Sequence, residues 1–221
     1  MKFVVQPGGQ FTGEHRVPGD KSMSHRAVML GSLAEGVTAV AGFLEGEDAL
    51  RTIAAFRQMG VAIEGPDAGS LTITGVGLHG LKAPDQALDL GNAGTGMRLF
   101  AGILAGQTFD SELVGDASLM QRPMGRVINP LSKMGARIDA LSEGRPPLVI
   151  SGGQSLQGIH YDLPIASAQV KSCVLLAGLY ARGRTSITEP APTRDHTERM
   201  LSGFGYDVDN TNGVIGLDGG G

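Results

Sequence analysis

The chain repeats one pattern three times, and this internal repetition limits the possible folds more than any other feature of the sequence. Each copy reads as strand, helix, strand, helix and two further strands. A glycine follows the predicted end of the second helix in every copy, at Gly60, Gly135 and Gly205, which lie 75 and 70 residues apart. Glycine just past the last helical residue is the expected C-terminal cap. The repeating unit is therefore about 70 residues long.

The same landmarks open and close each copy. A glycine and an extended segment begin the copies at residues 13–17, 80–82 and 158–161. A short strand closes them at residues 71–75, 148–152 and 215–219. The first helix of each copy is apolar, is rich in small residues and runs toward Gly36, Gly106 or Gly183. This composition predicts that the three first helices are buried.

One such unit cannot cover both its sheet and its helices, whereas three units packed together can. We therefore predict an α/β (α+β) fold, with three βαβαββ units around a pseudo-threefold axis and helix N-termini facing a cleft. No low-complexity linker interrupts residues 13–219, so these form one domain, with units at about 13–77, 78–153 and 154–219. A doubly wound sheet with coincidental glycine spacing is the weaker alternative.

Composition excludes several classes of function. Hydrophobic residues make up 41% and charged residues 18%, as in an ordinary globular protein. The net charge of −4 argues against binding to nucleic acid, which needs a basic surface. The single cysteine, Cys173, forms no internal disulfide framework and suits a reducing compartment. The apolar stretches are too short for a signal peptide or a membrane span, so we expect a cytoplasmic protein with no membrane partner.

Polar residues gather in every copy at the turn before the first helix. These turns and first helical turns are residues 18–26, 91–98 and 164–171. Each offers free backbone N–H groups and the positive end of a helix dipole. Arg26, Arg98 and Lys171 stand about one turn into their helices, against the local dipole preference. Taken alone, each is an ordinary cap or solvated cation, but together they predict a convergent site for an anionic ligand, most simply a phosphate.

Other apparent motifs carry less weight. GNAGTG at residues 91–96 lacks the GK[ST] ending of a nucleotide loop, and the G-x-G-x-x-G at residues 75–80 precedes no helix. The histidines and Cys173 show no metal-ligand spacing, and Cys173 lies in an apolar run typical of a core. Asp195, His196 and Glu198 are expected to open a helix. The sequence therefore predicts neither a metal nor a cofactor.

Five segments together resemble the 5-enolpyruvylshikimate-3-phosphate synthase family, the enolpyruvyl transferases of the shikimate pathway. They are PGDKSMSHRA, LGNAGTGMRL, QRPMGR, SAQVKS and TRDHTERML, and they span residues 13 to 219 in family order. The resemblance implies the enolpyruvyl transferase fold, with two similar lobes of three βαβαββ units and about twice this length. The chain would be the N-terminal half, and residues 1–12 would pack as a strand against the C-terminal lobe, which is this chain's expected partner. A monomer is expected.

The resemblance implies transfer of the enolpyruvyl group of phosphoenolpyruvate to the 5-hydroxyl of shikimate 3-phosphate, with release of phosphate, on the route to chorismate and the aromatic amino acids. Lys21 would touch both small anionic substrates. The residues implied for shikimate 3-phosphate are Lys21, Ser22, Arg26, Ser167, Ala168, Gln169 and Arg194. Those implied for phosphoenolpyruvate are Lys21, Asn92, Gly94, Thr95, Arg122 and Gln169. They would position reactants and stabilise charge, while the acid and base residues belong to the C-terminal lobe.

The sequence departs from the family pattern at three places. Ala168 replaces a common serine, and Arg194 would supply charge in its stead. Leu99 stands where many members have proline. Gly94 is the form linked to sensitivity to the inhibitor glyphosate, whereas Leu99 and Ala168 resemble the more tolerant branch, so sensitivity stays open.

Two alternatives remain at this point. The related UDP-N-acetylglucosamine enolpyruvyl transferases share the fold, but they have Lys-Asn where this chain has Lys21 and Ser22, and commonly a reactive loop cysteine. The chain could also be a non-catalytic lobe that complements a separate C-terminal chain. For the half of a synthase that the resemblance implies, we expect weak, salt-dependent binding of shikimate 3-phosphate and no synthase activity by this chain alone.

Overall fold

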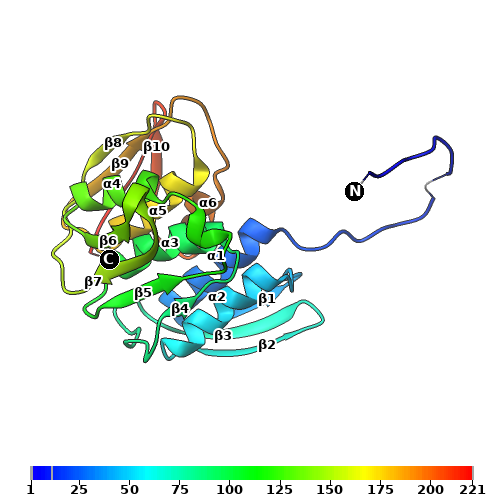
Figure 1. The fold of residues 1–221 in the computed structure, drawn as a ribbon, viewed down its shortest axis with the longest axis horizontal. Helices are drawn as coiled ribbons and strands as arrows, with labels where there is room; N and C mark the ends of the chain where they lie inside the picture. The colour runs from blue at the N-terminus through cyan, green and yellow to red at the C-terminus, as the bar shows by residue number, and fades with distance from the viewer. Residues whose placement is uncertain (1, 11, 221) are drawn as a thin grey trace.

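The computed structural model describes residues 2–10 and 12–220, which form an extended N-terminal arm and three successive units (Figure 1). The first unit contains α1 (Lys21–Leu33), β1 (Glu35–Ala41), α2 (Glu47–Gln58), β2 (Ala62–Asp67) and β3 (Ser70–Val76). The second contains β4 (Leu88–Asp89), α3 (Gly94–Ala105), β5 (Ser111–Val114), α4 (Gly125–Lys133), β6 (Arg137–Leu141) and β7 (Arg145–Ser151), with short 3-10 helices at Leu119–Gln121 and Ser142–Gly144. The third contains β8 (His160–Asp162), α5 (Ala168–Gly178), β9 (Arg184–Thr188), α6 (His196–Gly203), β10 (Asp209–Thr211) and β11 (Val214–Asp218).

Each unit has its own sheet. The strand orders are β1-β3-β2, β4-β5-β7-β6 and β10-β11-β9-β8. In the second and third units the opening strand runs parallel to the strand that follows the first helix, so β4 pairs with β5 and β8 pairs with β9. All other pairings are antiparallel. These two units confirm the predicted βαβαββ pattern.

The first unit lacks the expected opening strand in the described part of the chain. Residues 13–17 are extended, but they belong to an exposed arm that leads away from the lobe, so the predicted sheet strand is wrong there (Figure 1). β1 consequently pairs only with β3 among the described strands. Residues 2–10 are also exposed, and positions 1 and 11 of the expected N-terminal strand lie outside the described residues.

The predicted opening of the second unit at residues 80–82 is also wrong. The backbone N–H of Lys82 donates a hydrogen bond to the carbonyl of Met59, at 2.9 Å, so this segment closes the first unit. The strand that opens the second unit lies further along, at Leu88–Asp89.

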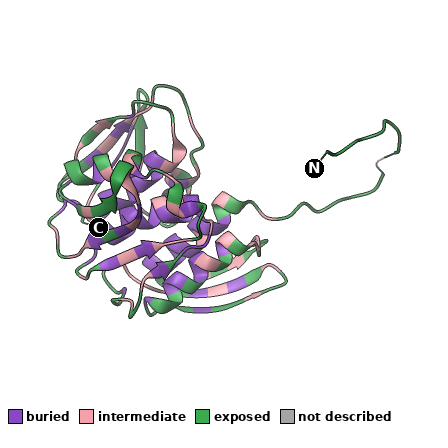
Figure 2. Ribbon diagram, in the orientation of Figure 1, coloured by how far each residue is buried: buried purple, intermediate pink, exposed green. Residues whose placement is uncertain are grey.

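The three first helices form the centre of the lobe, as predicted (Figure 2). α3 and α5 approach closely at Gly102, where an added Cβ would lie 2.3 Å from the carbonyl oxygen of Cys173. Any larger residue at this crossing would force the two helices apart. Phe100 of α3 packs on Phe56 of α2, with 5.0 Å between ring centroids, and joins the second unit to the first.

The second helices end where the glycine pattern predicts. Gly60, Gly135 and Gly205 follow α2, α4 and α6 with φ angles of +87°, +102° and +85°. This left-handed conformation is available to glycine without a steric penalty. Among the described residues, no helix is both long and apolar enough to cross a membrane.

Candidate functional site

The first turns of α1, α3 and α5 meet at one small polar pocket beside the start of α6. Its lining residues are Ser22, Arg26, Thr95, Ala168, Gln169, Arg194 and His196. A more open hollow of about 480 Å³ adjoins it, lined by Ala166, Ser167, Ala168, Gln169, Pro192, Thr193 and Arg194. We call the two together the helix-start pocket. The predicted convergence of the three helix starts is confirmed.

The local sequence leaves these helix starts free to attract an anion. In the described chain, α1, α3 and α5 carry no acidic residue in their first turns, whereas α2 begins with Glu47 and Asp48 and α6 carries Glu198. An acidic side chain in the first turn would offset the positive end of the dipole. α3 and α5 therefore keep their positive potential for a ligand, whereas the Asp20 carboxylate at the N-cap of α1 offsets part of it there.

Two capping residues fix the positions of the helices. The Asp20 carboxylate accepts a hydrogen bond from the backbone N–H of Met23, at 2.7 Å, and caps α1. The Ser167 hydroxyl accepts one from the N–H of Val170, at 3.4 Å, and caps α5. Ser167 thus supports the helix start and also lines the hollow, next to the backbone of Ala168.

Arg26 joins the first unit to the third inside the protein. Its guanidinium donates to the hydroxyls of Thr197 at 2.6 Å and Ser172 at 2.7 Å, and to the carbonyl of Ser22 at 2.9 Å. Burial lowers the pKa of Arg26 to about 10, and the opposing attraction of Glu198 is smaller. The side chain stays charged at neutral pH, so it supplies positive potential beneath the pocket.

Two side-chain hydrogen bonds cross between units at the mouth of the pocket. Arg194, which is exposed, donates to the Ser22 hydroxyl at 3.5 Å. Gln169 donates to the Thr95 hydroxyl at 2.9 Å. These pairs bring together residues far apart in the chain, and both Arg194 and Gln169 face the open hollow.

A second group of predicted residues surrounds the start of α3. Arg122 donates to the Asn92 side-chain oxygen at 2.5 Å, and the Asn92 amide donates to Asp116 at 2.7 Å. That hydrogen bond from Asn92 is the main reason why the pKa of Asp116 lies below its usual value. An added Cβ at Gly94 would lie 2.9 Å from the Arg122 guanidinium, so glycine gives the cation room. Asp116 was not predicted from the sequence to contact this group.

Neighbouring cations add to this group. Burial lowers the pKa of Arg98, and repulsion from Arg122 and Arg126 lowers it further. Arg98 also donates to the carbonyl of Gly94 at 3.1 Å. The start of α3 therefore gathers several positive charges, which is the electrostatic condition for attracting an anion.

Lys21 opens α1 and is about half exposed, with 54% of its side chain accessible. Its ammonium forms an ion pair with Asp48 in the first turn of α2. A bound anion would compete with Asp48 for this ammonium. Lys21 thus lies at the N-terminal end of α1, but its charge is paired with Asp48 and it is not among the residues that line the helix-start pocket.

The sequence-based prediction for Lys171 is wrong. It was expected as a cation of the convergent anion site, but its side chain is only 1% exposed and points into the core. Its ammonium lies 2.8 Å from Glu189 and 2.6 Å from Glu198. The desolvated ammonium is held by these two carboxylates because a buried charge needs compensating partners. Neither carboxylate was predicted to have this role.

Cys173 is fully buried in α5, and burial raises the pKa of its thiol. A buried, protonated thiol is a poor nucleophile, which confirms the interpretation of Cys173 as a core residue. Asp195 precedes α6, as expected from the sequence. The described residues include no cluster of three His, Cys, Asp or Glu side chains suited to a metal ion.

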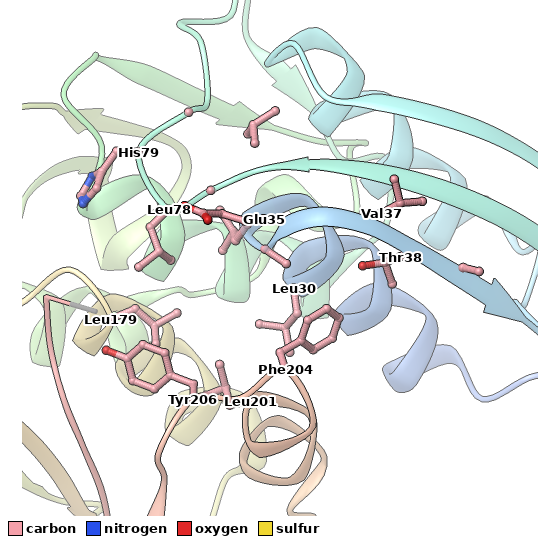
Figure 3. A pocket seen from close by; sticks show the side chains of 16 residues that line it. Leu30, Glu35, Val37, Thr38, Leu78, His79, Leu179, Leu201, Phe204 and Tyr206 are labelled. Carbon is pink, nitrogen blue, oxygen red and sulfur yellow. The ribbon is translucent and has the colours of Figure 1, made fainter.

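A larger apolar groove of about 990 Å³ runs between the first and third units (Figure 3). We call it the β1 groove, because β1 forms one wall. Its apolar lining includes Leu30, Val37, Leu179, Leu201, Phe204 and Tyr206. It contains few charged groups, so it does not have the chemistry of an anion site.

The chain matches a family model described as EPSP synthase (3-phosphoshikimate 1-carboxyvinyltransferase) over residues 5–220. Among curated relatives, the 3-phosphoshikimate 1-carboxyvinyltransferase of Alkalilimnicola ehrlichii is 64% identical over 221 residues, covering 100% of this chain and 50% of the relative. That of Hydrogenovibrio crunogenus is 67% identical over 208 residues, covering 94% and 47%. A solved structure of EPSP synthase from Acinetobacter baumannii superposes with a TM-score of 0.93 at 63% identity, covering 95% of this chain and 47% of that one. The chain therefore spans about half the length of the relatives it matches.

Proposed function

This chain belongs to the EPSP synthase family, and we propose that it is the half of a 3-phosphoshikimate 1-carboxyvinyltransferase that grips shikimate 3-phosphate. The observation that carries the proposal is the meeting, at the helix-start pocket, of three helix starts that have no acidic residue in their first turns. Phosphate is well matched to free N–H groups, helix dipoles and guanidinium donors.

In the proposed complex, the phosphate lies in the hollow at the start of α5. The backbone of Ala168 and the hydroxyl of Ser167 face it, and Arg194 adds a charged donor from the opposite wall. Gln169 packs against the ring, while Ser22 and the charge of Arg26 complete the site from α1. Arg194 thereby replaces the hydroxyl that Ala168 lacks.

We assign the phosphoenolpyruvate side to the start of α3. Asn92, Gly94, Thr95 and Arg122 lie there, and the hydrogen bond from Gln169 to Thr95 connects this group to the first substrate. Lys21, at the start of α1, is proposed to leave Asp48 and contact both substrates. These residues hold and orient the two anions, which lowers the entropic part of the barrier.

The C-terminal half of the polypeptide is the proposed partner, and it would supply the groups that move protons. The β1 groove supports such a partner, because β1 lacks the parallel neighbour that β5 and β9 have in the described structure. Val37 on β1 is 70% exposed. We propose that a segment of the remaining polypeptide covers this apolar surface. The complete protein is proposed to act in the cytoplasm as a monomer, in keeping with the single, buried cysteine of this chain.

The proposal is tested by calorimetric titration of shikimate 3-phosphate into the chain at low salt. Wild type should bind, and Lys21→Ala should bind at least several-fold more weakly because it loses one charged contact. Lys82→Ala, which removes an exposed lysine outside the pocket, is the matched control and should bind like wild type. Absence of binding by wild type, or equal binding by Lys21→Ala, would count against the assigned site.

The acceptor is tested with the full-length parent protein. Assays with shikimate 3-phosphate and with UDP-N-acetylglucosamine should show turnover of the first only. Turnover of the nucleotide sugar would favour the related transferase instead.

A further inference from the structure

Lys171, Glu189 and Glu198 form a buried charge cluster that does not line the helix-start pocket. The cluster is nevertheless connected to the loop that carries Arg194. We propose that Lys171 is a positioning residue, which holds the loop 189–195 so that Arg194 faces the anion. This inference rests on the proposed function, because it concerns how Arg194 is held in position to bind phosphate at the same site.

Lys171 lies on α5 and reaches two other elements at once. Its ammonium contacts Glu189, which directly follows β9, at 2.8 Å, and Glu198, in the first turn of α6, at 2.6 Å. These are the two elements that loop 189–195 connects. The buried ammonium therefore ties both ends of the loop to the central helix.

A further contact fastens the middle of the loop. The hydroxyl of Thr193 donates to the second carboxylate oxygen of Glu189, so one carboxylate bridges Lys171 and Thr193. Arg194 is the next residue along the chain. The path from Lys171 to Arg194 thus passes through one carboxylate and one hydroxyl.

Hydrogen bonds also fix the start of α6, which follows the loop 189–195. Thr197 donates to Ser172 on α5 at 2.7 Å, and it accepts from Arg26 at 2.6 Å. Arg194 therefore lies between two anchored points, Thr193 and Thr197. Its own contact with the rest of the site is the long hydrogen bond to Ser22, at 3.5 Å, which is too weak to hold it alone.

The charges explain why the lysine is needed. Glu189 and Glu198 are both largely buried, with side chains 8% and 13% exposed. Without Lys171 the two carboxylates would lose their shared cation, and Glu198 would keep only its electrostatic attraction to Arg26. Because a buried carboxylate without a partner is costly, the loop would move to bring Glu189 to solvent. Arg194 would move with it.

A double-mutant cycle tests the proposal, with shikimate 3-phosphate as the probe in calorimetry. Lys171→Met should weaken binding at least about tenfold, although the lysine itself is outside the pocket. Arg194→Ala should weaken binding by a similar factor in the wild-type background but by less than about twofold in Lys171→Met. If Lys171 were merely structural, the two losses would multiply, and that result would overturn the proposal.

A milder variant guards against misfolding. Thr193→Val removes one hydroxyl and leaves the three buried charges in place. It should weaken binding by about threefold to tenfold and should again reduce the effect of Arg194→Ala. An undiminished effect of Arg194→Ala in this background would contradict the proposal.

Hydrogen exchange of the ligand-free chain separates this inference from the proposed function. The N–H of Arg199, which donates to the Asp195 carbonyl at 3.0 Å, should exchange at least about tenfold faster in Thr193→Val and Lys171→Met than in wild type, while the amides of β3 stay unchanged. If wild type binds no shikimate 3-phosphate, the proposed function fails, but the exchange rates still decide the role of Lys171. Unchanged exchange at Arg199 would overturn it.

Discussion

Two hollows of this lobe, the helix-start pocket and the β1 groove, differ in size and chemistry, and the smaller one has the features of a ligand site. The helix-start pocket joins residues from all three units around hydrogen-bond donors and cations. The β1 groove is wider and apolar, and it lies where the first unit lacks the opening strand that the other two units have. The comparison teaches that volume alone does not identify the site. Positive charge and converging helix starts indicate ligand binding. An unpaired strand edge beside apolar side chains indicates instead a surface that another segment of polypeptide covers.

The largest expected effect concerns the β1 groove. The chain alone should show no synthase turnover, and mixing it with the separately expressed C-terminal half of the parent should restore activity. Val37→Asp should reduce the restored rate by at least about 100-fold, because docking would bury an unpaired carboxylate. Binding of shikimate 3-phosphate should be unaffected by this change.

Val149→Asp is the matched control, since Val149 is an exposed valine on β7 outside the groove. It should leave restored activity close to wild type. Equal losses of restored activity in both variants, or turnover by the chain alone, would contradict the proposed role of the β1 groove.

The next effect concerns the contact between α1 and α2, where His25 is fully buried and forms a hydrogen bond with the Thr52 hydroxyl at 2.7 Å. Burial lowers the pKa of His25 from 6.5 to about 4. Below pH 6.5 the unfolded chain takes up this proton first, so the free energy of unfolding should fall by about 3 kcal/mol between pH 6.5 and 4. Above pH 6.5 His25 is mostly neutral in both the folded and the unfolded chain, so it does not lower the free energy of unfolding there.

Urea unfolding at pH 7 and pH 4.5 measures this loss. His25→Gln keeps a polar group next to Thr52 but cannot take up the proton, so its stability should depend less on pH in this window. A pH dependence as steep as that of wild type would show that another group is responsible.

A smaller effect is expected from Arg194 in the pocket. Arg194→Ala removes a charged donor to phosphate and should weaken binding of shikimate 3-phosphate by about 10- to 100-fold, or about 1.5–3 kcal/mol. Arg137→Ala, at an exposed arginine of β6, is the control and should have little effect. If calorimetry showed comparable affinities for the two variants, Arg194 would not be a binding residue of the site.

Salt should produce the smallest effect and should separate the two hollows again. Raising ionic strength from about 0.01 M to about 0.15 M shortens the screening length from about 30 Å to about 8 Å. Affinity for shikimate 3-phosphate should then fall several-fold, whereas reassembly with the C-terminal half through the apolar groove should not weaken. A salt-independent affinity for the phosphate would argue against a cationic pocket.

The sequence was sufficient to predict the repeated units and the meeting of their helix starts, because both depend on local signals. Glycine marks the ends of α2, α4 and α6, and small polar residues mark the starts of α1, α3 and α5. Three amphipathic units of equal pattern then leave few ways to cover their apolar faces.

The direction of Lys171 could not be predicted in this way. A lysine in a first helical turn can face solvent or core, and here the choice depends on Glu189 and Glu198, which come from two other elements. The opening strands were misplaced for a similar reason. Whether residues 13–17 pair with β1 depends on tertiary contacts rather than on their own β-propensity.

The three helix starts are proposed to form the binding site for phosphate. The most direct test is a crystal structure of this chain with bound shikimate 3-phosphate. We expect the phosphate at the start of α5, within hydrogen-bond distance of Ser167, the Ala168 N–H and the Arg194 guanidinium. A phosphate bound in the β1 groove, or held by residues outside the helix-start pocket, would contradict it.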